Sequence, residues 1–149
     1  MSWQQWLAAR DVQPHTTSKQ ELDNLRALIA RDLADAAIPA LSPDRRFATA
    51  YNAALQAATL SVACSGYRVT ARAGHHAVTF EAARFAIGQP AKAFTDYFDF
   101  CRRKRNVIDY QHSSVATETE AAELLGNAVQ FHSVVETWMA ANHPHLKAS

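Results

Sequence analysis

The fold is decided by residues 42–66, which read SPDRRFATAYNAALQAATLSVACSG. Ser42 is placed to cap a helix that takes Pro43 in its first turn, and Gly66 is placed to end it. Between them, apolar residues recur at the spacing of one helix face, namely Phe47, Tyr51, Ala54, Leu55, Ala58 and Val62. The alanines of this set are small, so we expect neighbouring helices to approach this helix closely.

Four further helices are expected, with ends set by capping residues, prolines and glycines. They run from Thr17 or Ser18 to Pro39, from Gly74 to Gly88, from Pro90 to a loop at His112–Ser114, and from Thr117, with Glu120 in a capping box, to Pro144. The segment Tyr67–Thr70 is extended but too isolated to build a sheet. Amphipathic helices with short connections predict an all-α fold, an antiparallel four- to five-helix bundle.

The 149 residues are expected to form one domain over residues 17–143, followed by a tail over 144–149. Residues 1–16 form a separate N-terminal arm or short helix. Trp3 and Trp6 share helical spacing there before Pro14 breaks the pattern. This segment either docks on the body of the protein or reaches a partner.

Composition narrows the class of protein. Fifteen basic and 14 acidic residues give a net charge of +1, so any affinity for nucleic acid has to come from a local patch. Cys64 and Cys101 fit no metal spacing and fall at apolar helix positions, which predicts buried thiols in a reducing compartment. The chain shows no signal peptide and no apolar run of about 18 residues. We therefore expect a cytoplasmic protein with no membrane partner, no metal and no cofactor.

The densest functional signal lies in residues 101–112, which read CRRKRNVIDYQH. A continuous helix places Arg105 and His112 on its apolar face, where a charge is costly unless it is paired or used. The planar guanidinium of an arginine suits a phosphate, and a histidine suits proton transfer near neutral pH. Asn106 is a candidate to hydrogen-bond a phosphate oxygen or to orient the histidine.

The spacing favours a site shared between two chains. Residues seven apart on a helix lie about 10 Å apart along its axis, so the two side chains of one chain do not easily bind the same phosphate. A two-fold axis could instead bring Arg105 of one chain to His112 of another. Structural alternatives remain open, because Arg105 can complement the helix C-terminus or pair with Asp109, and the whole run Arg102–Arg105 can be a solvated face.

Three other histidines lie at positions where a structural or a functional role is expected. His75 and His76 open a helix, where they either cap it or contact a ligand, and no acids or thiols complete a metal site around them. His132 lies in the middle of an apolar stripe and is expected to be a hydrogen-bonded core histidine. Arg102 and Tyr110 join His75 and His76 as candidate ligand-binding residues.

The Arg105–Asn106 pair near the end of a bundle helix, the histidine downstream and the all-helical layout resemble HEPN domains (higher eukaryotes and prokaryotes nucleotide-binding). The resemblance covers most of residues 20–143. Ser42–Phe47 with Tyr51–Asn52, the Gly74–His76 turn and Arg102–Tyr110 also resemble a bacterial subgroup of largely uncharacterised HEPN proteins.

The resemblance implies a helical homodimer formed through the motif-bearing helices. Active HEPN domains are metal-independent endoribonucleases, often toxins paired with a nucleotidyltransferase-like antitoxin, which by analogy could modify Tyr110. On this reading Arg105, Asn106 and His112 are catalytic and RNA is the substrate. Other HEPN domains are non-catalytic and bind a nucleotide or a partner protein. Asp109 and Tyr110, where many active members carry a closer histidine, favour this second reading.

Overall fold

The computed structural model describes residues 1–110 and 113–149, apart from the side chains of residues 109 and 110. In chain order the elements are α1 (Trp3–Ala8), β1 (Val12–Pro14), α2 (Lys19–Ala36), α3 (Pro43–Cys64), β2 (Tyr67–Val69), α4 (His75–Ile87), α5 (Gln89–Tyr110), α6 (Glu118–Asn142) and a 3-10 turn, η1 (Pro144–Leu146). The expected all-α class is confirmed. Within the described ranges, no helix is both long and apolar enough to cross a membrane.

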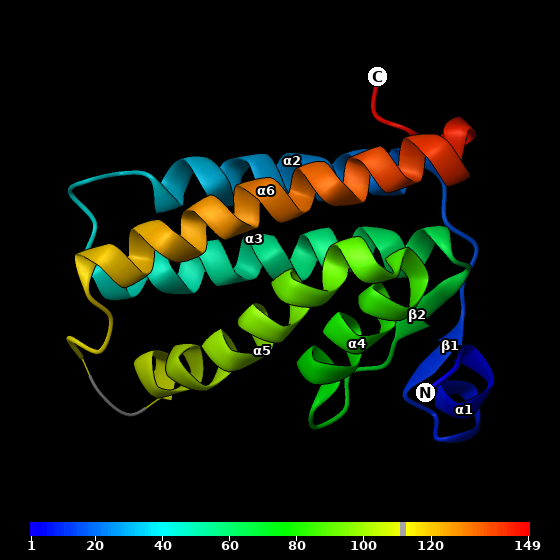
Figure 1. Ribbon diagram of the computed structural model, residues 1–149, viewed down its shortest axis with the longest axis horizontal. Helices are drawn as coiled ribbons and strands as arrows, with labels where there is room; N and C mark the ends of the chain where they lie inside the picture. The colour runs from blue at the N-terminus through cyan, green and yellow to red at the C-terminus, as the bar shows by residue number, and fades with distance from the viewer. Residues whose placement is uncertain (111–112) are drawn as a thin grey trace.

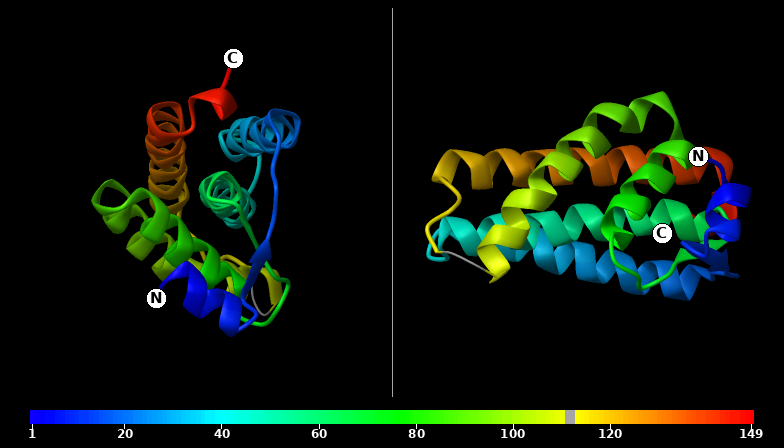
Figure 2. Two further views of the ribbon diagram at one scale, coloured as in Figure 1. Left: turned by 90° about the vertical axis from the view of Figure 1, so that its right-hand side faces the viewer. Right: turned by 90° about the horizontal axis from the view of Figure 1, so that it is seen from below.

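Helix α3 occupies the centre of the molecule. Figure 1 shows α2 antiparallel to α3, and α5 antiparallel to α6, while α3 and α6 run in the same direction. Seen end-on in Figure 2, α2, α6 and the α4–α5 pair are arranged around α3. Five alanines of α3 are at most 1% exposed, namely Ala50, Ala53, Ala54, Ala57 and Ala58. Their small side chains allow this close approach on several sides, as the sequence predicts.

The helix ends follow the predicted local chemistry. The side chains of Ser18, Ser42 and Thr117 each accept a hydrogen bond from the backbone N–H three residues later. Thr117 and Glu120 form the expected capping box. Gly88 ends α4 with φ +93°, a left-handed conformation that favours glycine. Local sequence signals therefore suffice to place these boundaries.

The expectation that no strands pair was wrong. Strands β1 and β2 form an antiparallel ribbon that pairs Val12 with Val69 and Pro14 with Tyr67. The ribbon is stable because it is packed against the body: Val12 is 2% exposed, and the Tyr67 ring stacks on Trp3 at a centroid distance of 4.3 Å. Tertiary packing thus provides the stability that a ribbon of two three-residue strands lacks on its own.

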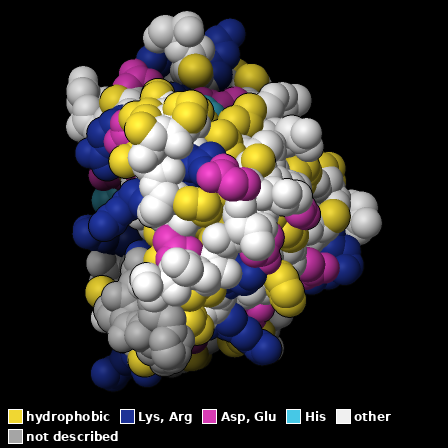
Figure 3. All heavy atoms as spheres, turned by 90° about the vertical axis from the view of Figure 1, so that its left-hand side faces the viewer, with side chains coloured by type: hydrophobic (Ala, Val, Ile, Leu, Met, Phe, Trp, Pro, Cys, Tyr) yellow, Lys and Arg dark blue, Asp and Glu magenta, His cyan; other side chains and the backbone are white. Residues whose placement is uncertain are grey.

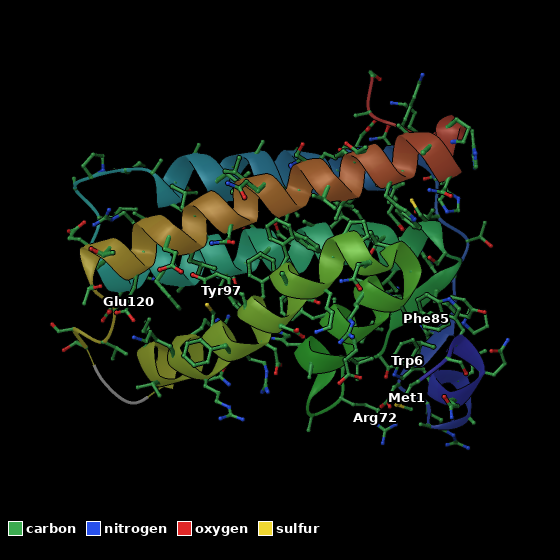
Figure 4. The ribbon with its side chains drawn as sticks, viewed as in Figure 1. Met1, Trp6, Arg72, Phe85, Tyr97 and Glu120 are labelled. Carbon is green, nitrogen blue, oxygen red and sulfur yellow. The ribbon has the colours of Figure 1, made fainter. Side chains whose placement is uncertain are left out.

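The N-terminal segment docks on its own chain, which settles one open alternative. Trp6 is 1% exposed and meets Phe85 of α4 edge to face at 5.7 Å, a contact that Figure 4 places between α1 and α4. At the other terminus Leu146 is buried under α6. Cys64 and Cys101 are buried free thiols, as expected, and burial raises the pKa of each to about 11.

A part-buried ion pair ties α2 to α6. Arg26 donates from Nε and Nη2 to the two carboxylate oxygens of Glu136 at 2.8 and 3.0 Å, and from Nη2 to the Leu146 carbonyl at 2.8 Å. Burial raises the pKa of Glu136, but its interactions with His132 and with the Arg26 guanidinium outweigh burial and lower it to about 2. His132 is a half-buried neighbour of this ion pair, with its Nε2 3.4 Å from Oε2 of Glu136, and not the hydrogen-bonded core histidine that its sequence position predicts.

Replacing Arg26 by alanine should lower the free energy of unfolding by about 3 kcal/mol at pH 7, because it leaves the carboxylate of Glu136 without its main cation. Urea denaturation followed by circular dichroism measures the change. The lowered pKa of Glu136 means that the stabilisation is complete above pH 4.5 and is lost as the pH falls toward 2, so the difference from wild type should shrink there. Arg45→Ala, at an exposed position on α3, is the matched control and should change stability little; an equal loss in both variants would contradict the account.

Candidate anion-binding site

A hollow of about 670 Å³ lies where the start of α4 meets the C-terminal half of α5. Its lining consists of Ala71, Arg72, Ala73, Gly74, His75, His76, Arg102, Arg105 and Asn106. Three of these residues are arginines and two are histidines, and none of the described lining residues is acidic. Figure 3 shows Lys and Arg side chains gathered along one edge of the end face where α3 begins, with a histidine among them. The hollow therefore has the charge and the concave shape of an anion site.

Two local features of the sequence bring these side chains together. Arg102, Arg105 and Asn106 are three and four residues apart on α5, so they share one helix face. Gly74, with φ +81°, caps α4 in a left-handed conformation and turns the chain so that His75 and His76 begin the helix beside α5. The N-terminal end of α4 also adds its positive dipole to the hollow.

The guanidinium of Arg105 contacts two residues of α3. Its Cζ lies 5.6 Å from the centre of the Tyr51 ring, within the range of a cation–π contact. Its Nη2 donates to Oδ1 of Asn52 at 3.4 Å. Both contacts fix the guanidinium between the core and the hollow.

His76 is also anchored on α3. Its Nδ1 lies 3.1 Å from the hydroxyl of Tyr51, whose side chain is fully buried. Burial raises the pKa of Tyr51, so the phenol keeps its proton. No other hydrogen bond involves this hydroxyl among the described residues, so we assign it as the donor to Nδ1. The neutral imidazole then carries its own proton on Nε2.

The electrostatics of the hollow keep His76 uncharged. Burial, followed by the charges of His75, Arg105 and Arg102, lowers the pKa of His76 to about 4. At neutral pH, His76 is therefore a hydrogen-bond donor through Nε2 rather than a cation. An anion bound beside Arg105 would oppose these effects and favour the protonated ring.

His75 has the complementary arrangement. Its Nδ1 lies 2.8 Å from the carbonyl oxygen of Arg72, which can only accept, so Nδ1 carries a proton, and Nε2 has a lone pair whenever the ring is neutral. The two histidine rings meet edge to face at 4.4 Å. The hollow thus offers one imidazole N–H donor and one imidazole acceptor side by side.

The remaining arginines are anchored but keep donors to spare. Arg102 donates from Nε to Asp99 at 3.0 Å. Arg72, in the loop before α4, donates from Nη1 to the Ala9 carbonyl at 2.5 Å, and Figure 4 shows it beneath α4 near α1. Because a guanidinium has five N–H donors, each arginine can also bind an anion.

The structure brings together five of the predicted residues, namely Arg102, Arg105, Asn106, His75 and His76. His112 and the side chain of Tyr110 lie outside the described residues, as does the proposed Asp109 carboxylate partner of Arg105. The basic run divides between two sides of α5, since Lys104 pairs with Glu120 of α6 and Arg103 is exposed.

Sequence reasoning assigned no ligand role to Arg72, Tyr51 or Asn52. For Tyr51, the sequence offers a hydroxyl within the apolar stripe of α3 and, together with Asn52, a place in the HEPN resemblance, but neither indicates a ligand role. Nothing in the sequence points to Arg72. Comparisons with models of protein families, with curated proteins and with solved structures found no match to this chain. Among the described residues, no group of three His, Cys, Asp or Glu could hold a metal ion. The function is therefore argued from the geometry of the hollow.

Replacing His76 by asparagine should flatten part of the pH dependence of stability. A histidine whose pKa is lowered in the folded state favours folding fully above its ordinary pKa of 6.5, and this contribution is lost as the pH falls toward 4. We expect wild type to lose more stability than His76→Asn between pH 6.5 and 4.5. Chemical denaturation at half-unit pH steps measures this loss, with His145→Asn, at an exposed position, as the control. Parallel curves for wild type and His76→Asn would contradict the assignment of a neutral His76.

Proposed function

We propose that this protein binds the phosphate group of a nucleotide or of RNA in the hollow between α4 and α5, without a metal ion. The observation that carries the proposal is the convergence of Arg102, Arg105 and His76 on a hollow whose described lining has no acid. Arginine forks match the oxygens of a phosphate, and charge-assisted hydrogen bonds are about twice as strong as neutral ones.

The preorganisation of the site supports binding over a merely solvated basic face. Arg105 is fixed by Tyr51 and Asn52, and His76 by Tyr51, so little side-chain freedom is lost when an anion binds. The net charge of the chain is only +1, so the affinity has to come from this local cluster. Binding should therefore weaken as the salt concentration rises.

The HEPN resemblance agrees with this proposal. The Arg105–Asn106 pair and the Gly74–His76 turn, two segments that carry the resemblance, line the same hollow. By the same analogy we propose that the protein acts as a homodimer through α5 and that a nucleotidyltransferase-like antitoxin is a candidate partner. His112 of a second chain could then complete the site.

A metal-independent endoribonuclease is the second candidate, and the pair of histidines favours it. His75 Nε2, with its lone pair, can accept the proton of a ribose 2′-hydroxyl as the 2′ oxygen attacks the adjacent phosphorus. Arg105 and the N–H of His76 can hold the phosphate oxygens while the bond to the 5′ oxygen breaks and that oxygen takes a proton from water. General base catalysis of this kind contributes about 10²–10⁴-fold to the rate.

Replacing Arg105 by glutamine should weaken the binding of labelled single-stranded RNA at least tenfold, because a charged hydrogen bond contributes about 1.5–3 kcal/mol. Fluorescence anisotropy in the presence of EDTA measures the affinity, and circular dichroism checks that the variant is folded. Arg103→Gln removes the same charge two residues away on the exposed side and should weaken binding far less. Equal losses of RNA affinity in both variants would mean that RNA binds a nonspecific basic surface and not the hollow.

The same samples distinguish binding from cleavage. Cleavage by the proposed route leaves 2′,3′-cyclic phosphate ends, is insensitive to EDTA and should be lost in His75→Gln. RNA that is bound by wild type but stays intact favours the non-catalytic reading. Cleavage that persists in both His75→Gln and Arg105→Gln would reject a nuclease site in this hollow.

A further inference from the structure

A second cavity adjoins the anion-binding hollow. It has a volume of about 340 Å³ and lies between α2, α3, β2 and α4, with His75 in the lining of both. Most of its wall is apolar and is made by Leu25, Leu55, Val62, Ala63, Tyr67 and Val69. Its volume is within the range of small-molecule sites.

The cavity wall is held in place before any ligand arrives. Tyr67 stacks on Trp3 with an angle of 12° between the rings, and its strand β2 pairs with β1. On the opposite wall, α2 is tied by the ion pair of Arg26. A preformed wall of this kind costs little ordering when a rigid apolar group enters.

The polar residues that line the cavity are His15, Glu21, Thr59, Arg68, His75 and Thr79. The hydroxyls of Thr59 and Thr79 donate to the carbonyls of Leu55 and His75 at 3.0 and 2.8 Å, so their oxygens retain lone pairs that can accept a further hydrogen bond. Glu21 accepts from His15 and Thr17 at 2.8 Å, in both cases through Oε1. These two hydrogen bonds lower the pKa of Glu21 and keep it ionised, with Oε2 available as a further acceptor.

We infer that the cavity and the hollow together hold one nucleoside phosphate, with the phosphate at Arg102 and Arg105 and the nucleobase in the cavity. This inference rests on the proposed function and narrows its ligand. A nucleobase is flat and rigid, its faces suit the aliphatic wall, and its edge N–H groups suit the acceptors Thr59 and Glu21. A fatty acyl chain would instead meet an ionised carboxylate in the lining, which it cannot solvate.

His75 connects the two parts of the site. It lines both spaces, and its Nδ1 is fixed on the carbonyl of Arg72 at 2.8 Å. Its Nε2 lone pair is an acceptor, which suits a ribose hydroxyl between base and phosphate. Along the site, the arginines of the hollow come first and His75 next, and the cavity, which is mostly apolar but is also lined by Glu21 and Arg68, comes last. This is the order of phosphate, ribose and base in a nucleotide.

The test compares AMP and CMP with ribose 5-phosphate and inorganic phosphate, by isothermal titration calorimetry on the full chain. We expect wild type to bind at least one nucleotide tenfold or more tightly than ribose 5-phosphate. Thr59→Phe and Leu25→Trp fill the cavity from opposite walls and should abolish that preference, while the affinity for inorganic phosphate stays within twofold. Leu28→Trp adds the same bulk at an exposed position of α2 outside the cavity lining, and is the control that should keep the preference.

The outcomes separate this inference from the proposed function. If ribose 5-phosphate binds as tightly as both nucleotides, or if neither filled variant changes nucleotide affinity, the base cavity is rejected while phosphate binding stands. If neither phosphate, nucleotide nor RNA binds, the proposed function itself fails. A free nucleotide and the 5′-terminal nucleotide of an RNA carry the same chemistry. Where nucleotide binds, competition between AMP and a 5′-phosphorylated RNA shows which of the two binds more tightly. Either result supports the cavity as a base site.

Discussion

The structure depends on the burial of α3 by helices on several sides. A helix in this position must present side chains small enough for its neighbours to reach its backbone, and the five nearly inaccessible alanines between residues 50 and 58 meet that requirement. Packing against α3 sets where α2, α6, α4 and α5 lie. The hollow forms at the seam where two of these helices, α4 and α5, meet above α3.

The candidate site follows from the one large polar side chain that α3 places in this core. Tyr51 is fully buried, yet its hydroxyl reaches His76 on α4 and its ring lies under Arg105 of α5. One residue therefore orients both an imidazole and a guanidinium. His76 stays neutral because burial and the positive charges of its neighbours act on the same ring. The described residues that line this site include Arg72, Arg102 and Arg105 and no acid, although Asp99, outside the lining, pairs with Arg102.

Much of the fold could be predicted from the sequence because its determinants are local. Ser18, Ser42 and Thr117 cap helices through residues three positions away, and the apolar stripe of α3 repeats every three or four residues. The β1–β2 ribbon could not be predicted, because Val12 and Val69 pair across more than fifty residues and their pairing depends on Trp3 and Trp6 finding the body of the protein. Helical spacing likewise places Arg102, Arg105 and Asn106 on one face. That His75, Arg72 and Tyr51 join them depends on how α4 packs, which no local pattern encodes.

If an anion binds between Arg105 and His76, as we propose, the protonation of His76 responds to it. NMR titration of the His76 ring should give a pKa of about 4 in the free protein, since burial and nearby positive charges oppose its protonation. With saturating nucleotide, the account predicts that this pKa rises toward or above the ordinary value of 6.5. A pKa that is the same with and without nucleotide, at concentrations that saturate binding, would show that the ligand lies elsewhere and would contradict the account.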